Sequence, residues 1–145
     1  MNTLLEKEYG KLEYNAENHF IKLTLIGNIS DEDYKYIWNL SLEEAQKVNC
    51  GNVLIDQRKI GFVKMMSRAW LILKWMPKSK QTAKDIEQKL AVLPSTHIAY
   101  RTGLTYLLDS VKKVLGNGFK FFENEEDAIS WLSLVKKEQE VENNV

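Results

Sequence analysis

Asp56 and Arg58 are the residues whose types and spacing could orient a polar ligand. They follow an apolar run, Val53 to Ile55, that is typical of a strand buried on both faces of a sheet. Open α/β sheets bind ligands at the carboxyl ends of their strands, so the segment from Asp56 to Gly61 is where this chain would place a site. A carboxylate and a guanidinium there could hold a ligand. They could equally pair with each other or cap the following helix.

Residues suited to metal or nucleophilic chemistry are scarce. The chain has one cysteine, Cys50, and two histidines, His19 and His97, and none has a further ligand at the spacing of a metal site. A Cys–His nucleophile would require the fold to bring Cys50 to a histidine, and no local motif indicates this. We therefore predict no catalytic residue, no metal and no cofactor, and we interpret Cys50 as a small buried thiol.

Composition and charge exclude several classes of protein. A length of 145 residues fits one domain with one core. Acidic and basic residues number 20 each, which gives no support for nucleic-acid binding. A single cysteine cannot form an internal disulfide and fits a reducing compartment, and no segment approaches the ~20 apolar residues of a membrane span. We expect a cytoplasmic protein without membrane insertion.

Hydrophobic periodicity predicts an α/β domain around the central strand. The predicted strands cover residues 9–14, 19–27, 51–56, 89–93 and 119–122, and the predicted helices cover residues 30–51, 62–77, 100–115 and 124–135. Right-handed crossovers make the last four strands mostly parallel. The prediction is a mixed, mostly parallel five-stranded sheet with an N-terminal β-hairpin and four helices. It forms a single domain of residues 1–136, followed by a charged tail, 137–145, that we expect to fray.

The predicted helix 62–77 has a strongly amphipathic pattern. Its core-facing stripe consists of apolar residues at helical spacing: Phe62, Met66, Ala69, Trp70, Leu73 and Met76. At about 100° per residue, Leu71 and Trp75 fall on the opposite, basic face, and Pro77 is expected to end the helix. Either charged side chains or the following loop cover Leu71 and Trp75, or the pair forms an exposed apolar patch that binds something.

Three segments resemble the SpoIIAA-like group of STAS and Sec14-type domains. They are the strand end Val53-Leu-Ile-Asp-Gln-Arg58, the apolar Lys89-Leu-Ala-Val-Leu-Pro94, and the ending Phe119-Lys-Phe-Phe-Glu-Asn-Glu-Glu-Asp-Ala-Ile-Ser-Trp-Leu132. The resemblance covers nearly the whole chain. It implies a β-α superhelical sheet, no cofactor and a binding role. STAS domains act as anti-anti-sigma regulators or transporter modules, and Sec14-type relatives hold lipids in an apolar pocket.

The resemblance also directs attention to Ser67. Anti-sigma antagonists of this group are switched by phosphorylation of a serine in an Asp-Ser-Ser-Gly motif. That serine lies at the start of the helix that follows the central strand. Here no aspartate precedes Ser67 and no glycine follows it, and Ser67 lies one residue out of register. A phosphate on Ser67 would lie near Lys64, Arg68 and a helix N-terminus, which favour an anion. The alternative is an exposed, solvated serine.

These observations predict a non-enzymatic interaction domain. We expect it to bind an unidentified protein partner, or a second copy of itself, through the helix after the central strand and the segment from Asp56 to Gly61. Leu71 and Trp75 would be the anchors. The alternative is a carrier of a small apolar or lipid-like ligand under a lid of residues 78–88. Its cleft would be lined by Phe62, Met65, Met66, Trp70 and Trp75.

Overall fold

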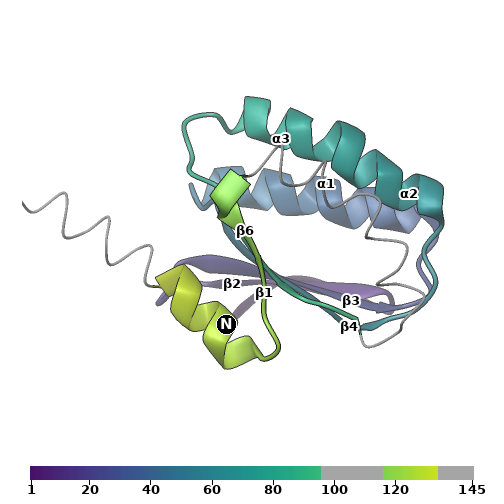
Figure 1. Ribbon diagram of the computed structural model, residues 1–145, viewed down its shortest axis with the longest axis horizontal. Coiled ribbons are helices and arrows are strands. Elements are labelled where there is room, and N and C mark those ends of the chain that lie inside the picture. Colours follow the sequence, from purple (N-terminus) through teal and green to yellow (C-terminus); the bar gives the residue numbers. More distant parts are fainter. Residues whose placement is uncertain (96–115, 134–145) are drawn as a thin grey trace, which may run out of the picture.

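The computed structural model describes residues 1–95 and 116–133 (Figure 1). Within these ranges one sheet contains six strands in the order β1-β2-β3-β4-β5-β6. They are β1 (Asn2–Lys7), β2 (Gly10–Asn15), β3 (Phe20–Gly27), β4 (Asn52–Ile60), β5 (Lys89–Leu93) and β6 (Phe119–Phe121). β1 to β3 pair antiparallel and β3 to β6 pair parallel. The predicted hairpin and the four parallel strands are confirmed.

Helices cover both faces of the sheet. α1 (Asp31–Lys47) lies over one face together with a continuous helix made of α2 (Met65–Trp70), η1 (Leu71–Trp75) and α3 (Met76–Thr82) (Figure 1). Helical residues 125–133 pack on the other face through Ala128 and Leu132. The structure is therefore α/β, as predicted. His97, the predicted helix 100–115 and the tail 137–145 lie outside the described residues.

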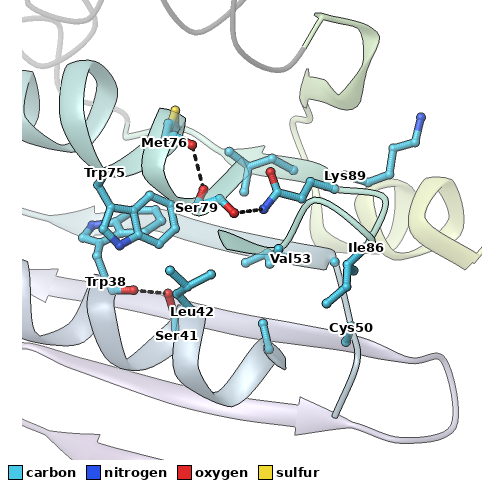
Figure 2. Close-up of a pocket in the computed structure, with 15 residues that line it drawn as sticks. Trp38, Ser41, Leu42, Cys50, Val53, Trp75, Met76, Ser79, Ile86 and Lys89 are labelled. Carbon is cyan, nitrogen blue, oxygen red and sulfur yellow. Dashed lines mark hydrogen bonds between the residues drawn. The ribbon is translucent and has the colours of Figure 1, made fainter. Parts of the chain in front are cut away.

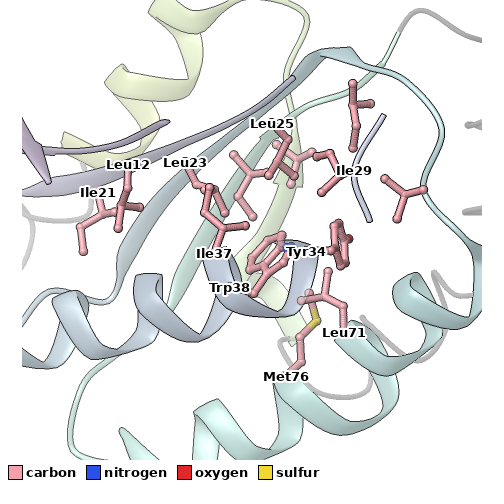
Figure 3. Close-up of a cluster of buried hydrophobic side chains, with 14 of the residues drawn as sticks. Leu12, Ile21, Leu23, Leu25, Ile29, Tyr34, Ile37, Trp38, Leu71 and Met76 are labelled. Carbon is pink, nitrogen blue, oxygen red and sulfur yellow. The ribbon is translucent and has the colours of Figure 1, made fainter. Parts of the chain in front are cut away.

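Two hydrophobic cores separate these layers. The larger core lies between the sheet and the α1 side, and includes Ile21 and Ile55 (Figure 3). The smaller core contains Phe20 and Leu54 and packs against the helical residues 125–133. Successive residues of β3 and β4 enter opposite cores because side chains alternate across a strand. This explains the unbroken apolar run of the central strand.

α1 begins at the predicted position. The Ser30 hydroxyl accepts a hydrogen bond from the Asp33 N–H at 3.1 Å, as an N-cap residue does. The helix is unbroken to Lys47 and stops short of the predicted end at Gly51. Asn49 has a φ of 52°, a left-handed conformation that cannot continue an α-helix.

β1 was not predicted from the sequence. Leu4 and Leu5 are adjacent, so they break the alternation that identifies a half-buried strand. The pairing of β1 with β2 shifts register between Thr3 and Leu5, and both leucines pack against the larger core. The irregular register therefore hid a sixth strand at the edge of the sheet.

The helix after β4 packs with a different face from the predicted one. Phe62, Met66 and Leu73 are exposed, so the predicted stripe is wrong at those positions. The buried positions recur about every four residues: Ser67, Arg68, Leu71, Ile72, Met76 and Ser79. On an α-helix with 3.6 residues per turn, side chains four residues apart are rotated by about 40° around the helix axis, so a stripe with this repeat gradually turns away from the core. The π turn η1 corrects the drift, and its Met76 N–H donates to the Leu71 carbonyl, five residues back.

The same π turn explains why Pro77 does not end the helix. Proline has no N–H, and in a regular α-helix its ring clashes with the carbonyl four residues earlier. Pro77 directly follows the wider π turn, and α3 continues to Thr82. The predicted end at Pro77 is therefore wrong.

Leu71→Ala tests this register, with Leu73→Ala as a matched control on the same helix. Leu71 is 5% exposed and Leu73 is 56% exposed. Truncation of a buried leucine leaves a cavity, so we expect Leu71→Ala to lower the free energy of unfolding by about 2–4 kcal/mol and Leu73→Ala by less than about 0.5 kcal/mol. Urea unfolding followed by circular dichroism measures both. A loss for Leu73→Ala as large as that for Leu71→Ala would contradict the register.

Candidate functional site

Asp56 and Arg58 lie within a strand, because β4 continues past the predicted end at Asp56 as far as Ile60. β3 extends to Gly27, which pairs with Ile60, and this provides a partner for the extra residues. The carboxyl end of β4 is therefore at Ile60. A site at the end of this strand would be built from the residues after Ile60. Asp56 and Arg58 lie further back, inside the strand.

Asp56 and Arg58 form part of a charged network that joins the sheet to the helical residues 125–133. Arg58 Nε and Nη2 donate to the two carboxylate oxygens of Asp56 at 3.0 and 2.8 Å. Arg58 Nη2 also donates to Glu125 Oε2 at 3.5 Å, and Lys22 Nζ donates to Glu125 Oε1 at 2.7 Å. Of the alternatives left open by the sequence, pairing of Asp56 with Arg58 is the one that the structure contains.

The environment of Asp56 favours its charged form. Burial raises the pKa of the Asp56 carboxyl, but hydrogen bonds from the Arg58 side chain and backbone outweigh burial and hold the pKa below its usual value. A lowered pKa in the folded state means that the pair stabilises the fold above the unfolded pKa of about 3.9. That contribution is lost as the pH falls through the lower, folded value.

Ser67 is completely buried near the start of α2, so the interpretation of an exposed serine is wrong. Its hydroxyl donates to Asp31 Oδ1 on α1 at 2.7 Å, and this hydrogen bond lowers the pKa of Asp31. Ser67 therefore links the first turns of two helices. A phosphate at this position would have to displace the Asp31 carboxylate, because the two anions repel each other.

Phe62, Met65 and Met66 form an exposed apolar surface at the carboxyl end of β4, here called the strand-end patch. Their side chains are 66%, 49% and 83% exposed. The backbone beneath them is well anchored, since the Phe62 N–H donates to Asn28 Oδ1 at 2.8 Å and the Ile29 N–H donates to the Phe62 carbonyl at 3.0 Å. Phe62 is thus presented by a loop that is tied to the end of β3, and Met65 and Met66 follow in the first turn of α2.

Gly61 makes this attachment possible. Its N–H donates to the Gly27 carbonyl at 2.8 Å. A Cβ atom at Gly61 would lie 2.5 Å from Asn28 Oδ1, so a larger residue would push away the side chain that accepts from Phe62. The close approach of the two loops therefore requires glycine.

A pocket lies at the opposite end of the sheet, between α1, α3 and the amino ends of β4 and β5 (Figure 2). Its solvent-accessible volume, the space open to the centre of a water molecule, is about 50 Å³. Most of its lining is apolar and includes Trp38, Leu42, Val53, Trp75, Met76 and Ile86. Trp75 is thus a lining residue, as the carrier hypothesis expected. Phe62, Met65, Met66 and Trp70 are not part of this lining.

The segment from α3 to β5 closes one side of the pocket, in the place that the carrier hypothesis gave to a lid. The Ser79 hydroxyl donates to the Met76 carbonyl at 2.8 Å, and Gln88 Nε2 donates to the Ser79 carbonyl at 3.3 Å (Figure 2). A Cβ atom at Gly51 would overlap the Glu87 carbonyl, so glycine is required for this segment to pass so close to the start of β4.

Cys50 lies beside His19, but the two do not form a nucleophilic pair. The Cys50 thiol donates to the backbone carbonyl of His19 at 3.3 Å, while Nδ1 of the His19 ring is hydrogen-bonded to the Tyr14 hydroxyl at 2.8 Å. Cys50 is buried, as predicted. Among the described residues, no three histidine, cysteine or acidic side chains gather in a way that could hold a metal ion.

Two solved structures are similar to this chain. One is an uncharacterized protein of the DUF3478 family with a SpoIIAA-like fold from Shewanella loihica PV-4, with a TM-score of 0.54 and 21% identity over 91% of this chain and 98% of that one. The other is the Bacillus cell fate determinant SpoIIAA in its phosphorylated form, with a TM-score of 0.56 and 15% identity over 85% of this chain and 98% of that one. The protein has a SpoIIAA-like fold.

No family model matches the chain, and no curated protein sequence does either. The similarity is therefore one of architecture. Within this SpoIIAA-like fold, the helix from Met65 to Thr82 contributes to both candidate surfaces, because the strand-end patch lies at its start and the pocket lies near its end. In residues 1–95 and 116–133, no helix has the length and apolar character needed to cross a membrane.

Several residues of the pocket, Trp38 and Leu42 among them, were not predicted from the sequence. Trp38 and Leu42 are four residues apart on α1 and so share a face, but this spacing is equally typical of an ordinary core. Ile86 stood in a polar segment that has no periodic signal. Only the packing of α3 beside α1 brings the three side chains together.

Arg58→Met tests the charged network. The Asp56 side chain is 9% exposed and the Arg58 side chain is 43% exposed, so the variant leaves a largely buried carboxylate without its main partner. We expect the free energy of unfolding to fall by about 1–3 kcal/mol at pH 7. The loss should shrink as the pH falls below the unfolded pKa of Asp56, about 3.9, and through its lower folded pKa, because the ion pair with Arg58 then ceases to stabilise the wild type.

Urea unfolding at several pH values measures this loss. The double variant Asp56→Asn with Arg58→Met is the control, and it should recover part of the stability at pH 7 because it removes the unpaired charge. A loss that stays constant between pH 7 and pH 3 would show that Arg58 acts through packing alone.

Proposed function

We propose that this domain is a STAS-type regulatory module that binds a protein partner through the strand-end patch. The observation that carries the proposal is the exposure of three large apolar side chains, Phe62 on an anchored loop and Met65 and Met66 in the first turn of α2. Aromatic residues and methionine are enriched in protein interfaces, and contiguous exposed apolar surface often marks an interaction site. A backbone that is already anchored at Phe62 also loses little conformational entropy on binding.

The proposed anchors differ from those expected from the sequence. Leu71 is buried, and Trp75 packs against the core with its ring 5.1 Å from that of Trp38 in an edge-to-face contact. Both residues pack the helix against the larger core, so they are not the proposed contacts with a partner. Phe62 takes the role of central anchor, with Met65 and Met66 beside it.

The charges near the patch favour a partner with an acidic rim. Lys59 precedes the patch, Lys64 lies within its loop, and both are exposed. The nearby Lys35 is paired with Asp31 at 3.0 Å. Interfaces commonly surround an apolar centre with polar residues, and opposite charges across the rim raise the rate of association.

Carriage of a small apolar ligand is the second candidate function. The pocket between α1 and α3 supports it, because its lining is largely apolar and includes two tryptophans. The two candidates use different parts of the same helix, so one does not exclude the other.

A photo-crosslinking amino acid placed at Phe62 tests the partner proposal. We expect p-benzoylphenylalanine at this position to give a discrete crosslinked product in living cells, and the mass of the product distinguishes a second copy from another protein. The same substitution at Tyr36 is the matched control, since Tyr36 is 50% exposed but lies on α1. Equal products from both positions, or none from position 62, would contradict the proposal.

Met66→Ser in the crosslinking protein adds a second test. Met66 is 83% exposed, so the substitution should leave the free energy of unfolding unchanged within about 0.5 kcal/mol. Loss of an interface side chain of this kind reduces affinity about tenfold when it lies near the centre of the contact. We therefore expect a clear fall in crosslinking yield from position 62. An unchanged yield would place the contact elsewhere.

A further inference from the structure

A second cavity lies beside the pocket of Figure 2, under the π turn. It offers about 40 Å³ to the centres of water-sized groups, and its lining includes Ile55, Gln57, Leu71, Ile72, Val92 and Phe121. Trp38, Met76 and Leu90 line both cavities, so a few shared side chains separate one from the other. Met76 is the most adaptable of them, because an unbranched thioether side chain changes rotamer easily.

Gln57 is the unusual residue of the second cavity. It is 7% exposed on β4, and its Oε1 atom is buried without a hydrogen-bond partner. A buried amide oxygen with no donor destabilises a folded protein, and most such atoms in native structures are satisfied. Among the residues that the structure describes, the other side chains of this lining are hydrocarbon and thioether groups, apart from the indole of Trp38, whose buried Nε1 is a hydrogen-bond donor. The cavity therefore combines an apolar wall with the Gln57 oxygen, an acceptor without a partner.

We propose that the two cavities form one binding site for a small, neutral, straight-chain alcohol. The hydroxyl group donates to Gln57 Oε1, and the apolar chain passes Met76 into the pocket between α1 and α3. This proposal rests on ligand carriage, the second candidate function, and adds the chemical class of the ligand. A charged head group is excluded because it would be buried without a partner of opposite charge.

The volumes set the length of the chain. Both cavities are small, with about 50 and 40 Å³ open to the centres of water-sized groups, so the ligand has a short chain. 1-Hexanol, a short straight-chain alcohol, is the probe. Leu71 and Ile72 of the π turn line the same cavity as Gln57, and π turns are frequent at functional sites.

Titration of the ¹⁵N-labelled protein with 1-hexanol tests the proposal. The indole N–H signals of Trp38 and Trp75, which line the site, should shift and saturate, whereas that of Trp131, which packs against the smaller core, should not move. Hexanoate at pH 7 has the same chain with a charged head group, and it should bind at least tenfold more weakly. Equal binding of hexanoate would overturn the requirement for a neutral ligand.

Two variants locate the ligand. Gln57→Leu keeps the side-chain size and removes the unsatisfied oxygen, so the protein should stay folded and bind 1-hexanol about fivefold more weakly. Ala83→Leu fills the pocket at the far end from Gln57 and should also weaken binding. Unchanged affinity in Gln57→Leu would overturn the role of Gln57.

Xenon separates the class of the ligand from carriage itself. If xenon shifts the Trp38 and Trp75 signals and 1-hexanol does not, the cavities accept apolar atoms and the alcohol assignment is wrong. If neither probe shifts them, ligand carriage fails as well. Neither result bears on the partner proposal, because crosslinking at Phe62 is measured separately.

Discussion

The packing of the helix from Met65 to Thr82 on α1 and the sheet is the interaction on which the rest of the structure depends. Its inward positions recur about every four residues, and a regular α-helix would rotate them progressively away from the sheet. The π turn at Leu71–Trp75 keeps Leu71, Ile72 and Met76 over the larger core. It also allows Pro77 to remain inside the helix. One local irregularity therefore sets the register of the whole element.

That register determines which side chains are available for binding. Leu71 and Trp75 turn toward the core, and Phe62, Met65 and Met66 are left exposed at the start of the helix. At the other end, the same register places α3 beside α1 and creates an apolar pocket between them. Both proposed activities use one helix, so a ligand that displaced Met76 would act on the element that carries the strand-end patch. Such a shared element is a physical basis for coupling between two sites.

The opposite face of the sheet is organised by charge as well as by apolar contacts. Lys22, Asp56, Arg58 and Glu125 join two strands to the first turn of the helical residues 125–133. An ion pair between exposed charges contributes little to stability. Loss of a partner of the buried Asp56 carboxylate would nevertheless be strongly destabilising, because the buried charge would then be unpaired. Asp56 and Arg58 are therefore better understood as structural residues than as a ligand site.

Local sequence patterns were enough to predict the α/β class, the parallel strands, the cap of α1 at Ser30 and the burial of Cys50. These follow from local patterns: alternation of side chains across strands, helical periodicity and hydrogen bonding of a serine to the backbone. The inward face of the helix after β4 depends on tertiary packing. Burying its whole apolar stripe gains more free energy than is lost by distorting one turn into a π turn. Tertiary structure also decided the length of β4, which depends on a neighbouring strand, and the pocket, whose side chains come from segments far apart in the chain.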